Sequence, residues 1–163
     1  MTGRFPHPTR DPAGHSFGAV PMPCSMPDSN RWRDCRPYLY GVDLFNHGYY
    51  WEAHEVWEVV WHACGRAGLA GDFFKGLIKL AAAGVKVREG RPAGTRSHAK
   101  RAAELFRQIA DQLPAEQTCY FGLSLARLID VAINVASGSA TASKSMTAPV
   151  EIVFPFVLLP GGM

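Results

Sequence analysis

The chain has 163 residues, of which 47% are hydrophobic and 19% charged, and its formal net charge is +3 at pH 7. This size and balance predict one globular domain with a modest core and exclude a disordered or fibrous chain. A net charge this small argues neither for nor against a polyanionic partner. No run approaches the roughly 18 apolar residues that span a bilayer, so we expect a cytoplasmic protein with no membrane partner.

The first 37 residues form a segment of their own, rich in proline and glycine. They hold seven of the twelve prolines, which excludes long helices and central strands. Residues 5–15 carry His7 and His15 in a backbone stiffened by proline, without the low hydrophobicity typical of disorder. Two alternatives stay open for residues 1–37: a floppy tail, or an ordered arm that packs on the domain.

From Tyr38 onward the pattern is helical, and breakers of Gly and Pro separate five segments. The expected helices cover residues 37–45, 48–64, 69–88, 95–112 and 122–136. Loops this short favour antiparallel neighbours. The sequence therefore predicts an all-α fold, with residues 38–137 as one compact multihelical domain.

The third expected helix has the pattern of a central packing helix. Its lysines Lys75, Lys79 and Lys86 fall in one narrow arc, and apolar residues cover most of the remaining circumference. Gly76 and Gly84 would let another helix approach closely, at a propensity cost of about 1 kcal/mol per glycine.

The last segment, residues 138–163, combines a linker of small residues with an apolar tail. Its apolar run, residues 150–159, is too short to span a membrane, and Pro155 argues against a helix or a central strand. We expect an extended tail that lies in a groove or pairs across a dimer. A homo-oligomer is therefore expected.

The four cysteines, Cys24, Cys35, Cys64 and Cys119, are widely separated in the sequence. None of them forms a Cys-x-x-Cys pair, so neither a zinc ribbon nor a dense disulfide framework is indicated. We expect reduced thiols.

The helix expected over residues 48–64 separates its ionisable groups from its apolar groups. At 100° per residue, one half carries every ionisable group and the other half would face the core. The ionisable groups are Glu52, His54, Glu55, Glu58 and His62. A solvated face usually mixes Lys or Arg with Glu, but this helix has no cation. Such carboxylates coexist more readily around a metal ion, or around a Lys or Arg from elsewhere.

The spacing His54-Glu55-x-x-Glu58 resembles that of a metal site. Residues i and i+4 project side by side, as in the His-Glu-x-x-His helix of zinc hydrolases, where the intervening Glu is the general base. Here Glu58 replaces the second His. A His with a carboxylate suits zinc, iron or manganese. The alternative is a solvated or hydrogen-bonded acidic face, because plain amphipathic helices also produce this short pattern.

Further histidines could complete such a site. His98 shares an apolar stripe of the helix over residues 95–112, so its ring should point inward. There it is either a core histidine bonded to a backbone carbonyl or a third ligand that meets His54 and Glu58. His62, near a helix end, is a weaker candidate.

Three segments of the chain resemble the helical domain of unknown function 309. The first, over residues 45–61, fits the string Phe-Asn-x-Gly-x-Tyr-x-Glu-x-His-Glu-x-x-Glu-x-x-Trp; the others are residues 74–83 and the pair Gly90 and Gly94. The resemblance covers about residues 38–113. It implies a compact all-α fold and a hallmark of four residues, but no established activity. The hallmark comprises His54, Glu55, Glu58 and Trp61.

The same resemblance bears on two other parts of the chain. Many relatives have Gln where this chain has Lys75 and Lys79, so it implies no role for these lysines. The arm with His7 and His15 is similar to segments that precede the helical domain in some relatives. This similarity favours an ordered arm near the site.

The first functional hypothesis is a metal-dependent enzyme, most plausibly a hydrolase acting on a small molecule. His54 and Glu58 would be ligands, completed by His98 or by a histidine of the arm. Glu55 would be the general base for a metal-activated water.

The second hypothesis is a non-catalytic helical module that oligomerises or binds a partner. Trp51, Trp57 and Trp61 would then be core or interface anchors, and the His and Glu residues would make structural hydrogen bonds. A third and weaker hypothesis is that the basic stretch over residues 75–107 binds an anion or a nucleic acid; no nucleic-acid motif accompanies this stretch, and a solvated basic face is the more ordinary interpretation. The sequence leaves the catalytic status open.

Overall fold

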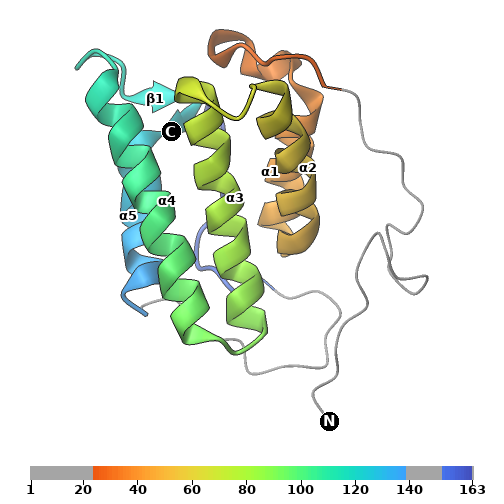
Figure 1. Cartoon of the computed structure of the whole chain (residues 1–163), viewed down its shortest axis with the longest axis vertical. Helices are drawn as coiled ribbons and strands as arrows, with labels where there is room; N and C mark the ends of the chain where they lie inside the picture. The colour runs from red at the N-terminus through yellow and green to blue at the C-terminus, as the bar shows by residue number, and fades with distance from the viewer. Residues whose placement is uncertain (1–23, 139–151, 163) are drawn as a thin grey trace.

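The computed structural model describes residues 24–138 and 152–162. The described residues are mostly helical, which confirms the all-α prediction (Figure 1). A 3-10 helix precedes five α-helices, and two very short strands lie before the last of them. The elements are η1 Ser29–Asp34, α1 Arg36–Asn46, α2 Tyr50–Ala63, α3 Gly68–Arg88, α4 Pro92–Gln112, β1 Cys119–Tyr120, β2 Leu123–Ser124 and α5 Leu125–Ala136. None of these helices is long and apolar enough to cross a membrane.

Helix α3 lies in the middle of the bundle, as its sequence predicts. It packs against α2 on one side and α4 on the other, while α1 packs on α2 and α5 packs on α4 (Figure 1). The arc of α3 that carries the lysines is therefore bordered by α2 and α4.

The two glycines of α3 are points of close contact, as expected. A Cβ at Gly76 would lie 2.6 Å from the ring of Phe106 on α4, and one at Gly84 would lie 2.7 Å from the ring of Tyr50 on α2. Real Cβ atoms do not come this close to other atoms, so both aromatic rings occupy the space that a side chain would need. These glycines lower the helix propensity of α3, but they allow α2 and α4 to pack closely against it.

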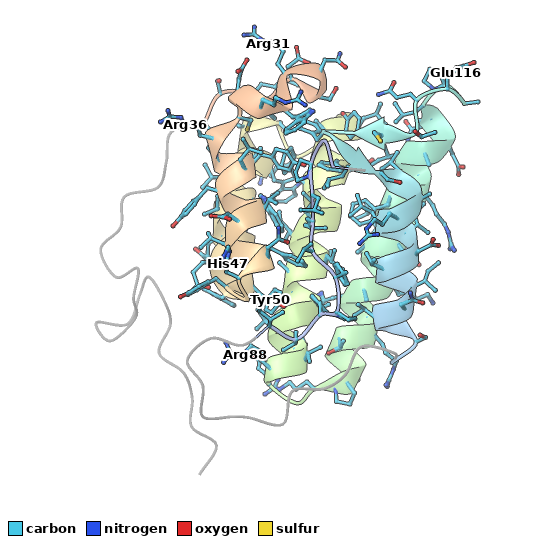
Figure 2. All side chains as sticks on the ribbon, turned by 180° about the vertical axis from the view of Figure 1, so that it is seen from behind. Arg31, Arg36, His47, Tyr50, Arg88 and Glu116 are labelled. Carbon is cyan, nitrogen blue, oxygen red and sulfur yellow. The ribbon has the colours of Figure 1, made fainter. Side chains whose placement is uncertain are left out.

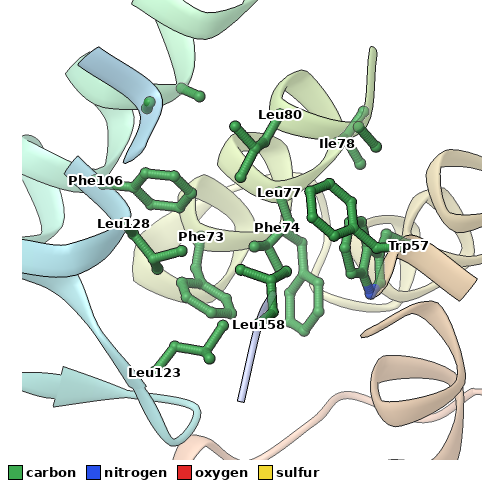
Figure 3. Close-up of a cluster of buried hydrophobic side chains, with 14 of the residues drawn as sticks. Trp57, Phe73, Phe74, Leu77, Ile78, Leu80, Phe106, Leu123, Leu128 and Leu158 are labelled. Carbon is green, nitrogen blue, oxygen red and sulfur yellow. The ribbon is translucent and has the colours of Figure 1, made fainter. Parts of the chain in front are cut away.

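The core is dominated by aromatic side chains from several elements. Trp57 is fully buried, and its Nε1 donates a hydrogen bond to the Tyr38 carbonyl oxygen at 3.2 Å. Phe73 stacks on Phe121 with ring centroids 5.1 Å apart. Figure 3 shows this cluster, in which Leu158 of the tail lies close to the aromatic side chains of α3. Helices and tail therefore share one core.

The predicted start of two helices was wrong. Helix α4 begins at Pro92 rather than at residue 95, because proline fixes a helical φ and lacks the N–H that a first turn leaves unpaired. Helix α5 begins at Leu125 rather than at residue 122, because residues 119–124 form an antiparallel hairpin. Its two turn residues, Phe121 and Gly122, have positive φ values of 50° and 76°, as a type I′ turn requires. The Tyr38 hydroxyl donates to the Phe121 carbonyl oxygen at 2.7 Å and anchors this turn.

The C-terminal tail has no helix or strand over residues 152–159, ends in a turn at residues 160–161 and lies on this same chain, between α1 and α5 (Figure 2). Val153, Phe154 and Leu158 are buried. The Asn46 side chain accepts a hydrogen bond from the Leu158 N–H and donates one to its carbonyl oxygen, both at 2.7 Å. The Tyr50 hydroxyl accepts a hydrogen bond from the Val153 N–H at 3.0 Å. The tail thus completes the hydrophobic core and has its backbone paired along the groove.

Three of the four cysteines gather near the start of α1, although they are far apart in the sequence. Burial, and to a smaller extent the neighbouring thiols, raise the pKa of Cys24 and of Cys64 to about 11, and burial also raises the pKa of Cys35. All four cysteines are free, as expected. These three thiols therefore stay protonated at neutral pH and act as small apolar groups.

Candidate functional site

Helix α2 has a buried face and a polar face; Val56 and Trp61, which we expected to face the core, are only half-buried. Tyr50, Ala53, Trp57 and Val60 are buried, as predicted. Glu52 is also buried, with 8% exposure, whereas we expected it on the polar side. The polar face is therefore narrower than the sequence indicated.

The structure brings His54, Glu55 and Glu58 together. One ligand atom from each of these residues can be chosen so that all three lie within 4.8 Å of one another. The His54 Nε2 and the Glu58 Oε1 are 3.6 Å apart, as expected for residues one helical turn apart. In the described part of the chain, this is the one group of three His, Cys, Asp or Glu side chains with metal-ligand spacing.

The His54 ring is largely buried but makes no hydrogen bond to the described residues. It stacks on Trp51, with centroids 5.5 Å apart and planes 20° apart. Its Nδ1 is buried and has no hydrogen-bond partner there, and its Nε2 is too far from Glu58 for one. An imidazole held this way has ring nitrogens available to another ligand.

The charges around His54 favour its neutral form. Burial lowers the pKa of His54, while Glu58 and Glu55 oppose this shift. Lys75 and Lys79 lower its pKa further. A neutral imidazole is the form that binds metal ions.

The cations that α2 lacks are contributed by α3. Lys75 places its Nζ 4.3 Å from the ring centroid of Trp61, the aromatic residue that follows Glu58 by three positions. Lys79 lies one turn further along α3, also near His54. Within the described residues, neither lysine forms an ion pair with Glu55 or Glu58. The sequence placed both lysines in one arc of α3, but it did not indicate that this arc borders the acidic face.

The other candidate histidines have different positions. His98 is half-buried on α4 and close enough to His54 for their charges to interact, but it is not part of the group of three. His62 is exposed at the end of α2. His7 and His15 lie outside the described residues. His98 as a ligand therefore stays a prediction, as do the two histidines of the arm.

The three residues of this group are half-buried rather than exposed. Two hollows of about 180 and 610 Å³ lie elsewhere, between α5 and the tail. Arg127, Val131 and Phe156 line both of them. Neither hollow includes a residue of the His54 group.

The fold and the site define a small helical domain with a His-Glu-Glu group on its second α-helix. Residues 38–98 match the model of a family described as a domain of unknown function, DUF309. This segment, which contains most of α1, all of α2 and α3 and the first part of α4, is therefore similar to that family. The match ends at residue 98, short of the residue 113 that the motifs indicated. No curated protein matches the chain.

Proposed function

We propose that His54 and Glu58, with the Glu55 carboxylate beside them, bind one divalent transition metal ion: zinc, iron or manganese. The spacing of the group is the observation that carries this proposal. Two ligand atoms about 2.1 Å from a tetrahedral metal are about 3.4 Å apart, and His54 Nε2 and Glu58 Oε1 are 3.6 Å apart. The two side chains would therefore need little movement to bind one ion.

The environment of His54 supports a ligand rather than a purely structural role. A structural histidine is expected to make hydrogen bonds, because a buried polar atom without a partner costs about 1–3 kcal/mol. His54 makes none with the described residues. Trp57, by contrast, is a core residue with a satisfied Nε1, so it is not available as an interface anchor.

Hydrolysis is the chemistry that this site supports best. A bound ion would lower the pKa of a coordinated water toward about 7. His54 and Glu58 would hold the ion, and Glu55 would accept the proton of the attacking water. The side chain of Glu58 is 41% exposed, so water and a substrate could reach this group from solvent.

The test is a calorimetric titration of zinc and manganese into chelator-treated protein. We expect one metal equivalent per chain and an increase in melting temperature. Glu58→Gln should weaken binding at least tenfold, whereas Asp130→Asn, an exposed carboxylate change on α5, should leave it unchanged. Absence of stoichiometric binding in the wild type, or equal binding by Glu58→Gln, would contradict the proposal.

A further inference from the structure

Helix α5 and the tail carry most of the large apolar side chains that the described residues expose. Of the six such side chains, Ile133 lies on α5, and Ile152, Val157 and Leu159 lie on the tail. Val157 and Leu159 also line the hollow of about 180 Å³ between α5 and the tail. A hollow bordered by exposed apolar side chains is typical of a surface that another protein covers.

Two opposite charges lie on the outer face of α5, which borders these hollows. Arg127 and Asp130 are one helical turn apart, both are exposed, and both line the larger hollow of about 610 Å³. A base and an acid at this spacing can pair along a helix, but neither side chain forms an ion pair with the other or with another described residue. The face therefore offers one positive and one negative group to a partner.

This pair of charges is complementary to a second copy of itself. In a two-fold dimer the same surface meets itself, so that residue i contacts residue j and j contacts i. Two α5 helices packed antiparallel about an axis midway between Arg127 and Asp130 bring Arg127 of each copy opposite Asp130 of the other. The same register brings Ile133 of each copy level with the other's Ser124, which lines the hollow of about 180 Å³. An apolar cavity of about 150 Å³ holds benzene, so this hollow has room for the Ile133 side chain.

We propose that a second copy of this chain docks on the outer face of α5, as a two-fold dimer with reciprocal ion pairs between Arg127 and Asp130. Apolar contacts around Ile133 supply most of the affinity, and the ion pairs fix the register, because exposed ion pairs contribute little stability by themselves. Helices α3 and α4 lie between α5 and α2 (Figure 1), so the dimer leaves the His54 group uncovered. The dimer and the metal site are therefore independent.

The experiment is sedimentation equilibrium of the full chain and of charge variants over a range of concentrations. We expect a reversible dimer of the wild type. Arg127→Asp leaves only acidic groups at the contact and Asp130→Arg only basic ones, so each variant alone should dimerise at least tenfold more weakly. An equimolar mixture of the two variants should restore the dimer, because each supplies the charge that the other lacks. Arg107→Asp, at an exposed position on α4, is the matched control and should change the dimer Kd less than twofold.

Melting curves establish that each variant is folded, and the charge variants should bind zinc as the wild type does. A wild type that stays monomeric from micromolar to millimolar concentration would overturn the dimer and leave this face to another occupant. Equal dimerisation of the wild type and the folded single variants would place the contact elsewhere on the molecule and also overturn the proposal. A mixture of the two variants that stays monomeric would contradict the pairing of Arg127 with Asp130.

Discussion

Polar groups in the groove that holds the tail have hydrogen-bond partners, whereas several polar groups on the face that carries His54 have none among the described residues. In the groove, Asn46 and Tyr50 pair with the tail backbone, and apolar side chains are buried around them. On the other face, His54 has no hydrogen bond and Lys79 no ion pair among the described residues. The groove therefore serves the fold, whereas the polar face has half-buried charges whose cost a ligand would offset. Departures from local consistency of this kind are expected at functional sites.

The largest loss of stability is expected when a side chain of the hydrophobic core is truncated. Trp57→Ala should lower the free energy of unfolding by about 3–5 kcal/mol, because the indole is fully buried and its hydrogen bond to Tyr38 is lost. Urea denaturation measures this change. Trp61→Ala, at a half-buried position beside the candidate site, should cost clearly less. Equal losses of stability for the two variants would show that Trp61 contributes to the core as much as Trp57 does.

A smaller loss is expected when the tail loses its side-chain partner. Asn46→Ala removes both hydrogen bonds to Leu158 and should destabilise the chain by about 1–3 kcal/mol. Asn134→Ala on α5, where the side chain is exposed, is the matched control. If the two substitutions destabilise the protein equally in urea, Asn46 does not hold the tail in solution.

The pH dependence of stability should come from the polar face. The pKa values of His54 and His98 are lowered in the folded protein, mainly by burial. Between these lowered values and the ordinary histidine pKa near 6.5, the unfolded chain binds more protons, so stability falls as the pH falls. Chelator-treated wild type should therefore lose stability from pH 7 to pH 5, and the double variant His54→Gln, His98→Gln should lose less. An equal loss in both proteins would assign the effect to other groups.

The smallest effect on stability is expected at Glu55. This half-buried carboxylate has no hydrogen bond or ion pair to the described residues, so Glu55→Gln should change the free energy of unfolding by no more than about 0.5 kcal/mol without metal. The same variant should bind zinc more weakly. A large loss of stability in metal-free protein would instead give Glu55 a structural role.

The helices could be predicted because their boundaries are local. Gly and Pro mark the ends of the segments, and the lysine arc of α3 identified its polar side. The hairpin over residues 119–124 was missed because strands of two residues are too short to show alternation. Its turn depends on Phe121 at positive φ, which Tyr38 holds from 83 residues away.

The candidate site could be predicted only in part for a similar reason. His54 and Glu58 are one turn apart on one helix, so spacing alone placed them together. The approach of Lys75 and Lys79 depends on how α3 is rotated against α2, which no pattern within either helix specifies. Glu52 lies near the edge of the predicted polar half, and tertiary packing buried it.

The most direct test of the metal site is anomalous diffraction from crystals of the full chain grown with zinc. Data collected on both sides of the zinc absorption edge locate the ion without reference to the protein density. The account predicts one anomalous peak within about 2.0–2.2 Å of a His54 ring nitrogen and a Glu58 carboxylate oxygen. A structure with zinc present in the crystal and no peak between His54 and Glu58 would contradict it.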